Sequence, residues 1–287
     1  MQPVISPSAI PVGHMVVWAN GTLYEDPRDA MITATDHGFV AGDGVFETMR
    51  VTQEGPFAVQ RHLNRLSRSA AVLGLPAPDH SRIHAAIDAA LAGQAIGHGR
   101  LRITYTGGPG PLGSQPAYGP PALVVAVEAT EPPAPSTAVM TVPWTRNEHG
   151  ALAGVKSTSY AENVRALAFA TSRGATEGIF LNTAGNVCEG SGANIFFVVN
   201  GTVITPPLSS GPLAGITREV ILEWCEVEER DLPLAEAKAA DEVFITSSLR
   251  DVQAVHRWDE MSCAPSHPVT DQVAATFAKQ SLSNLDP

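Results

Sequence analysis

Alternation of apolar and polar residues marks strands along most of the chain. The stretch MVVWANGTLYE, residues 15–25, alternates around Asn20-Gly21, a dipeptide typical of tight hairpin turns. Asn200-Gly201 predicts a second hairpin. Short apolar runs predict further strands over 44–51, 100–107, 121–129, 138–143, 177–182, 193–199 and 241–248.

Helical spacing appears between these strands. In RHLNRLSRSAAVLGL the residues Leu63, Leu66, Ala70 and Leu73 recur at the period of one helix face. The same kind of pattern predicts helices over 61–75, 79–94, 160–174 and 217–229, followed by a helix near the C-terminus. The pattern is typical of an α+β protein.

A proline-rich stretch, TEPPAPST, divides the pattern into two parts. We therefore expect two domains, a smaller N-terminal one over 15–130 and a larger C-terminal one over 138–287, joined by a linker over 131–137. Residues 1–14 contain three prolines and no positive charge, so we interpret them as an N-terminal extension rather than a signal peptide.

Composition narrows the class of protein. The 287 residues are 44% hydrophobic and 16% charged, which favours a compact globular chain over a disordered one. A net charge of −11 gives no basic surface for nucleic acid or an anionic membrane. The three cysteines are far apart and lack metal-site spacing, which is typical of a reducing compartment. We expect a cytoplasmic protein that binds no metal.

Lys156 stands in an unusual place. The chain has only three lysines, and the other two, Lys238 and Lys279, lie in stretches with a helical pattern. Lys156 follows the apolar, glycine-rich run HGALAGV and precedes several hydroxyl residues. Burial among apolar neighbours favours the neutral amine, which forms an imine with an aldehyde. The ordinary alternative is a lysine whose stem packs while its ammonium group reaches solvent.

Other segments contain groups that an aldehyde cofactor with a phosphate would need. The stretch PLAGITREV places Gly215, Ile216 and Thr217 at the start of a helix, where free N–H groups attract anions. Ordinary helix capping by Thr217 would explain the same residues. The strand DEVFITSS ends in three hydroxyls, the last from Ser248, and Glu189 lies between glycines in CEGSG. A polar turn explains the hydroxyls equally well, and an exposed acid explains Glu189.

Three arginines share one face of the predicted helix 61–75. Arg61, Arg65 and Arg68 recur at helical spacing beside the apolar stripe, a pattern that usually marks a solvated face. Arg65 directly precedes Leu66 and borders the buried side, so we expect it to be the one that reaches inward.

The order of these motifs resembles one enzyme family. GDGVFETMR, HLNRL, the lysine with its following helix, CEGSGANIFFV, LAGITRE and DEVFITSS resemble the class IV, or fold-type IV, pyridoxal-phosphate enzymes over nearly the whole chain. This family includes D-amino acid, branched-chain and (R)-amine transaminases and aminodeoxychorismate lyases. The resemblance implies a two-domain fold with the cofactor between the domains, and a homodimer.

The resemblance also implies roles for individual residues. Lys156 matches the lysine that binds pyridoxal 5'-phosphate as an imine and moves the substrate proton, and Glu189 matches the partner of the pyridine nitrogen. The remaining cofactor positions match Arg65, Ile216, Thr217 and Ser248 at the phosphate and Leu213 under the ring. Tyr160 lies near the position of a tyrosine found in branched-chain enzymes, but it is four residues after the lysine rather than five.

The substrate is less clearly indicated. A substrate carboxylate needs an arginine or several N–H donors, and the candidates are Arg50, Arg102, Arg146 and Arg250. Arg50 and Arg102 match arginines of the branched-chain substrate pocket, although surface charges or structural ion pairs would explain them too. The familiar D-amino acid enzymes have a tyrosine where this chain has Phe46, and an arginine and a histidine in a loop that reads GGPGPLGS here.

Several functions therefore remain open. We favour a transaminase that moves an amino group between an amino acid, with a leaning to D-amino acids, and a 2-keto acid. An aminodeoxychorismate lyase that releases 4-aminobenzoate and pyruvate is the first alternative, and a branched-chain or (R)-amine transaminase is the second. A hydrolase built on Lys156 and Ser157 would leave Glu189 and Arg65 without a role, and a binding protein on the same scaffold would need no turnover at all.

Overall fold

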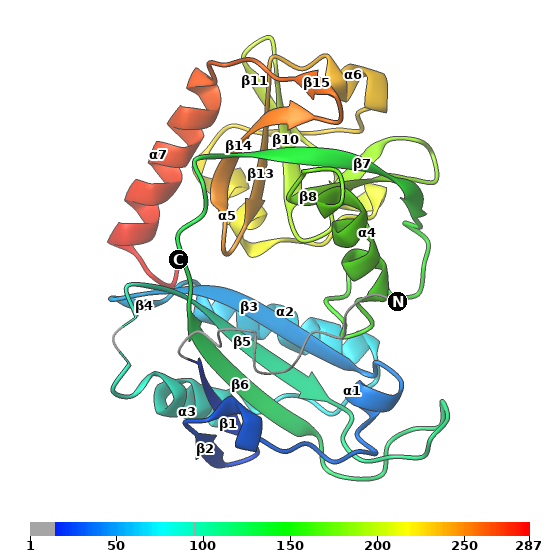
Figure 1. Cartoon of the computed structure of the whole chain (residues 1–287), viewed down its shortest axis with the longest axis vertical. Coiled ribbons are helices and arrows are strands. Elements are labelled where there is room, and N and C mark those ends of the chain that lie inside the picture. The colour runs from blue at the N-terminus through cyan, green and yellow to red at the C-terminus, as the bar shows by residue number, and fades with distance from the viewer. Residues whose placement is uncertain (1–14, 95) are drawn as a thin grey trace, which may run out of the picture.

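The computed structural model describes residues 15–94 and 96–287. The extension expected over 1–14 lies outside the described residues. The chain forms two mixed sheet-and-helix units, one above the other in Figure 1. The prediction of an α+β protein is confirmed.

The first unit is an antiparallel six-stranded sheet in the order β2-β1-β6-β5-β3-β4. Two longer helices pack against one face of this sheet, α2 over β3 and α3 over β1 and β6. The strands are β1 (Met15–Ala19), β2 (Thr22–Tyr24), β3 (Gly44–Thr52), β4 (Gly55–Pro56), β5 (His98–Thr106) and β6 (Ala122–Ala129). The helices are η2 (Pro27–Asp29), α1 (His37–Val40), α2 (Val59–Val72) and α3 (His80–Leu91).

Strand β3 connects the core of this unit with the functional cavity. Val45, Met49 and Val51 alternate onto the helix-covered face, where they join the hydrophobic core with Leu63 and Leu66 of α2. Phe46, Thr48 and Arg50 face the second unit, because side chains of a strand alternate between its two faces. One strand thus anchors the core on one side and supplies cavity residues on the other.

The second unit is a larger sheet in the order β12-β11-β10-β13-β14-β7-β8-β9, with β15 paired to β14. Strand β7 pairs in parallel with both β14 and β8. The strands are β7 (Ser136–Arg146), β8 (Glu177–Asn182), β9 (Val187–Gly190), β10 (Asn194–Val199), β11 (Thr202–Thr205), β12 (Glu228–Glu229), β13 (Glu242–Ser247), β14 (Asp251–Trp258) and β15 (Met261–Ser262). The helices are α4 (Ala161–Thr171), η3 (Leu208–Ser210), α5 (Ile216–Trp224), α6 (Leu234–Lys238) and α7 (Pro268–Ser283).

The two units are tied together at more than one point. The chain passes from one sheet to the other between Ala129 and Ser136, so β7 begins inside the predicted linker. The C-terminal tail returns to the first unit, where the Ala58 N–H donates to the Leu285 carbonyl over 2.6 Å. Figure 1 shows the C-terminus lying between the two units, beside β4.

Two expectations for secondary structure differ from the structure. The helix predicted over 217–229 is wrong at its C-terminal end, because α5 stops at Trp224 and Cys225 is extended. Glu228 and Glu229 instead pair in parallel with β11. The long strand β14 follows β13 without a helix, and the apolar pattern did not predict it. No helix in the described part of the chain is long and apolar enough to cross a membrane.

Candidate active site

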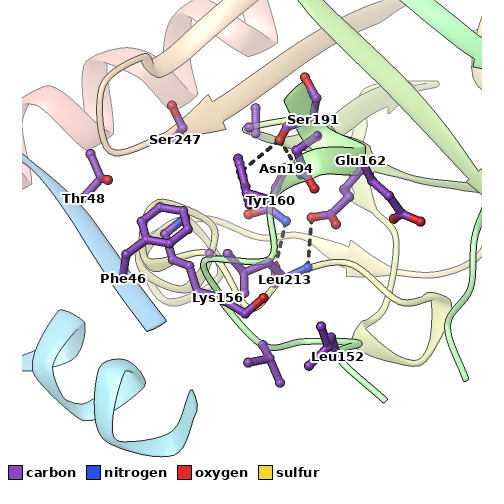
Figure 2. Close-up of a pocket in the computed structure, with 18 of the residues that line it drawn as sticks. Phe46, Thr48, Leu152, Lys156, Tyr160, Glu162, Ser191, Asn194, Leu213 and Ser247 are labelled. Atoms are coloured by element: carbon purple, nitrogen blue, oxygen red, sulfur yellow. Dashed lines mark hydrogen bonds between the residues drawn. The ribbon is translucent and has the colours of Figure 1, made fainter. Parts of the chain in front are cut away.

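Lys156 lies on the segment that connects β7 to α4, and this segment is held against the first unit. The Phe46 N–H donates to the Lys156 carbonyl over 3.0 Å, and the Lys156 N–H donates to Ser69 Oγ over 3.3 Å. Nζ of Lys156 lies 4.4 Å from the centre of the Phe46 ring. Figure 2 shows the two side chains next to each other in the cavity. Hydrogen bonds to both β3 and α2 therefore fix the backbone of a half-buried lysine.

The surroundings of Lys156 change its protonation. Burial, helped by the positive charges of Arg65 and Arg102, lowers the pKa of Lys156 from 10.5 to about 8. About a tenth of the side chain is therefore a neutral amine at pH 7, against far less for a free lysine, and this is the form that attacks a carbonyl carbon. The expectation of a desolvated lysine agrees with this environment.

Glu189 lies on β9, at another wall of the same cavity. The Leu213 N–H donates to its Oε2 over 2.9 Å, and Nε of Arg146 lies 3.3 Å from its Oε1. Burial raises the pKa of Glu189, while Arg146 and the Leu213 N–H act in the opposite direction. The carboxyl group is thus oriented from both sides, in a region where it can share a proton with a basic ring nitrogen.

The start of α5 forms an anion-binding end of the cavity. No side chain of the described residues caps this helix, so the N–H groups of Ile216 and Thr217 have no partner from ordinary capping. Arg65 reaches this helix start from α2 and donates to the Ala214 carbonyl over 2.8 Å. Ser248 lines the cavity beyond the end of β13. A helix N-terminus, an arginine and a hydroxyl together suit a phosphate group.

One cavity of about 1130 Å³ brings these residues together. All seven predicted cofactor-binding positions line it: Arg65, Lys156, Glu189, Leu213, Ile216, Thr217 and Ser248. In addition, Oγ1 of Thr246 is buried in the cavity wall without a hydrogen-bond partner among the described residues. An unpaired buried hydroxyl is costly unless a ligand or water supplies its partner. The donor set and this hydroxyl fit a phosphorylated pyridine aldehyde.

The four candidate arginines for a substrate carboxylate have different surroundings. Arg146 and Arg250 line the cavity, but both are engaged: Arg146 with Glu162 at 3.0 Å and with Glu189, and Arg250 with Glu177 at 3.4 Å. The expectation that they are free for a substrate is therefore not supported by their contacts.

Arg50 is placed outside the cavity lining. It shares a face of β3 with the cavity residues, but lies further along the strand, where it pairs with Asp251 and stacks 5.2 Å from the centre of the Phe57 ring. We therefore correct the expectation for Arg50, because its charge is used in a contact between the two units.

Arg102 is the candidate whose charge is not paired. No carboxylate in the described part of the chain lies within ion-pair distance of it, and its Nε donates to Thr104 Oγ1 over 3.2 Å. Its guanidinium carbon lies 3.8 Å from the centre of the Phe46 ring, and burial lowers its pKa. An arginine that is desolvated without a partner acid is suited to bind a substrate carboxylate.

Tyr160 and Phe46 also line the cavity, with ring centres 5.2 Å apart in an edge-on arrangement. The Tyr160 hydroxyl donates to the Ser191 carbonyl over 3.0 Å, as Figure 2 shows, and Asn163 donates to the same carbonyl. Burial raises the pKa of Tyr160 to about 12, so the hydroxyl keeps its proton. In this arrangement Tyr160 supports the turn that follows Glu189.

Sequence reasoning missed two buried residues behind the anion-binding end. Glu47 of β3 accepts hydrogen bonds from Arg65 through both of its oxygens, at 2.8 and 2.6 Å, and lies 2.6 Å from Nδ1 of His62. Both Glu47 and His62 are fully buried. A signal was present, because an acid on the core-facing side of a strand requires a basic partner, and His62 and Arg65 share one helix face.

Comparison with known proteins agrees with the geometry. The family model described as amino-transferase class IV matches residues 44–258. A Methanocaldococcus jannaschii protein that is named among the branched-chain-amino-acid aminotransferases is 33% identical over 85% of this chain and 88% of its own length. A Mycobacterium tuberculosis bifunctional aminodeoxychorismate lyase / D-amino acid transaminase is 28% identical over 85% of this chain and 91% of its own.

A solved structure has the same fold. It is described as a hypothetical aminotransferase from Mycobacterium tuberculosis in its PLP-bound form, and it matches with a TM-score of 0.82 and 27% identity. The match covers 93% of this chain and 99% of the other.

Proposed function

The chain belongs to the class IV aminotransferase family, and on that premise we propose that its cavity transfers an amino group between an amino acid and a 2-keto acid. The observation that supports this proposal most strongly is the convergence of Lys156, Glu189 and Arg65 on one cavity, although they come from distant parts of the chain. Class IV aminotransferases use pyridoxal 5'-phosphate.

The residues that would bind the cofactor lie at two ends of the cavity. Arg65, the start of α5 and Ser248 would hold the phosphate, while Glu189 would face the pyridine nitrogen and Leu213 would support the ring. When bound, pyridoxal phosphate supplies an aldehyde and a pyridine ring that withdraws electrons. The phosphate end is positively charged and the nitrogen end is acidic, so the cavity favours one orientation of such a molecule.

Lys156 would bind the cofactor and transfer the substrate proton. Its neutral amine would serve as the nucleophile toward the aldehyde, and the same Nζ would remove the α-proton of an amino acid and return it. A lowered pKa near 8 suits both tasks, because a general base acts best when its pKa is near the working pH. Phe46 covers the amine on the side of β3, which excludes water from that side.

Arg102 is our proposed anchor for the substrate carboxylate. It lies over the ring of Phe46, as Lys156 does, so a carboxylate bound there would keep the α-carbon of an amino acid near Nζ. We propose D-amino acids as the donors, supported by the similarity to the Mycobacterium tuberculosis protein whose name includes D-amino acid transaminase. Because the familiar arginine and histidine are missing from the loop GGPGPLGS, Arg102 would replace them.

Single-turnover measurements test this proposal. The holoenzyme is mixed separately with D-alanine, L-alanine, D-glutamate, L-glutamate and L-leucine, and the absorbance of the bound cofactor is followed. A change with the D-enantiomers that exceeds the change with the L-enantiomers supports the proposal. A reversed preference assigns the enzyme to L-amino acids, and no change with any of them contradicts the transaminase function.

A lyase is the second candidate because of the similarity to a relative that has this activity in its name. Aminodeoxychorismate is bulkier than alanine or leucine, and a relative named above carries both activities in its name. Release of 4-aminobenzoate and pyruvate from aminodeoxychorismate would identify this activity.

We also propose a homodimer. Large apolar side chains are exposed on α1 and on the loop 107–121, namely Phe39, Leu112 and Tyr118, each more than two-thirds exposed. A second copy of the chain would cover them. Light scattering after size exclusion should give twice the mass of the chain, and Phe39→Glu should give the monomer. A monomeric wild-type protein contradicts the proposal.

We further propose a cytoplasmic location. Cys188, Cys225 and Cys263 are all free thiols, as a reducing compartment would keep them. Fractionation of the source cells with an antibody against the chain tests this.

A further inference from the structure

The two side chains at the phosphate end are connected behind the cavity by a chain of buried contacts. Glu47 binds Arg65 with both oxygens and contacts Nδ1 of His62 at 2.6 Å. Nε2 of His62 in turn lies 3.4 Å from Oγ of Ser248. One carboxylate thus connects, directly or through one imidazole, two groups that face the same anion position.

The contacts fix the direction of each hydrogen bond. Burial lowers the pKa of His62, while Arg65 and Lys156 add to this effect and Glu47 opposes it. In the neutral imidazole, Nδ1–H donates to the Glu47 carboxylate, so Nε2 is left as an acceptor that faces Ser248. The imidazole therefore limits the positions that the Ser248 side chain can adopt.

The chain of contacts also crosses between the two units. Glu47, His62 and Arg65 belong to the first unit, whereas Ser248 and the Ala214 carbonyl, which accepts from Arg65, belong to the second. The phosphate end is therefore assembled from both units. Its geometry depends on the contacts that fix the position of one unit relative to the other. The contact of His62 with Ser248 is long, so the imidazole limits the rotamer of Ser248 while the hydroxyl hydrogen stays available to an anion.

We infer that His62 is a positioning residue for the phosphate-binding end: it holds Ser248 in place through Nε2 and is itself oriented by Glu47, which also orients Arg65. His62 would touch neither the cofactor nor the substrate. Its contribution appears as affinity for the phosphate group, because a binding group that is already oriented loses less entropy when the ligand arrives. This inference rests on the phosphate end proposed above.

The test compares two ligands that differ only in the phosphate. Dissociation constants of pyridoxal phosphate and of pyridoxal are measured by absorbance on the cofactor-free full chain, so the readout is binding and not turnover. The variants are His62→Asn, Ser248→Ala and the double variant. Asparagine keeps a donor near the position of Nδ1, toward Glu47, but has no atom at the position of Nε2.

A matched control lies on α3 and contacts the helix that carries His62. His80 contacts Oγ of Ser67 on α2 at 2.8 Å, so His80→Asn removes another histidine–serine contact beyond the cavity. This variant should bind both ligands as the wild-type protein does. Thermal unfolding of each variant confirms that the chain is folded before binding is measured.

The expected result is a selective loss. His62→Asn should weaken binding of pyridoxal phosphate about tenfold and leave binding of pyridoxal unchanged, as expected for a lost contact to an anion-binding group. Because His62 acts through Ser248, the double variant should bind no more weakly than Ser248→Ala alone.

Three results overturn the inference. One is an equal loss for both ligands, which would indicate general damage to the fold, and another is no loss for either. The third is an additive loss in the double variant, which would mean that His62 acts independently of Ser248. If the wild-type chain itself binds pyridoxal phosphate no better than pyridoxal, the proposed phosphate end fails instead.

Discussion

Nζ of Lys156 lies 4.4 Å from the centre of the Phe46 ring, so the amine of one unit is covered by an apolar side chain of the other. This arrangement explains much of the cavity's chemistry. Burial and the positive charges of Arg65 and Arg102 disfavour the ammonium form, and the pKa falls to about 8. Burial of this amine therefore makes the folded chain less stable and makes Lys156 more reactive.

A stabilised variant is the first consequence. Because the pKa of Lys156 is about 8 in the folded protein and 10.5 as a free side chain, the unfolded chain binds the extra proton more tightly. Lys156→Met should therefore raise the free energy of unfolding of the cofactor-free protein by up to about 3 kcal/mol below pH 8.

The sign of this effect can be checked against pH. The gain from Lys156→Met should shrink as pH rises from 8 to 10.5 and vanish above that range, since the lysine is then neutral in both states. Urea unfolding at several pH values measures it. A gain that is independent of pH would show that packing, and not the charge, is responsible.

Loss of the acid at Glu189 should affect the reaction more than binding. Glu189→Gln keeps the acceptor for the Leu213 N–H but cannot protonate a ring nitrogen, so kcat should fall on the order of 100-fold. Glu162→Gln is the matched control, because Glu162 is the other, more exposed partner of Arg146. Steady-state kinetics give kcat for both variants. Equal kcat values would exclude the proposed role of Glu189 at the ring nitrogen.

Arg102 and its neighbour Arg100 give a second matched pair. Arg102→Met removes the unpaired guanidinium, so KM for the amino acid should rise about tenfold or more. Arg100 also lines the cavity but pairs with Glu128 at 3.2 Å, so Arg100→Met should leave KM nearly unchanged. If Arg100→Met raises KM more than Arg102→Met does, Arg100 and not Arg102 binds the substrate carboxylate.

Arg50 should matter for stability and not for the substrate. It pairs with Asp251 across the two units, so Arg50→Met should lower the free energy of unfolding by about 1–3 kcal/mol without changing KM. Asp251→Asn should cost a similar amount, and the double variant should cost less than the two single losses together. A raised KM in Arg50→Met would contradict this assignment and show that Arg50 contributes to substrate binding.

Local patterns predicted much of this molecule. The hairpins, most strands and the helix that carries Arg65 follow from apolar periodicity, and the start of α5 follows from GITRE. The end of α5 could not be predicted in the same way, because Glu228 and Glu229 are extended through pairing with β11, a tertiary contact. Intrinsic helix preference is weak beside such pairing.

The roles of the arginines could not be predicted from a single sequence for a similar reason. Arg50 and Arg146 are neutralised by acids that become neighbours only in the folded chain, Arg50 by Asp251 and Arg146 by Glu162 and Glu189. Arg102 differs from them because it has no such partner in the part of the chain that the structure describes, and that difference is visible only in three dimensions.

The most direct test of the central claim is the site of covalent attachment. The holoenzyme is reduced with borohydride, digested, and mapped by mass spectrometry. We expect the reduced pyridoxyl-phosphate group on Lys156. Attachment to Lys238 or Lys279 instead, or a chain without any modified lysine, would contradict it.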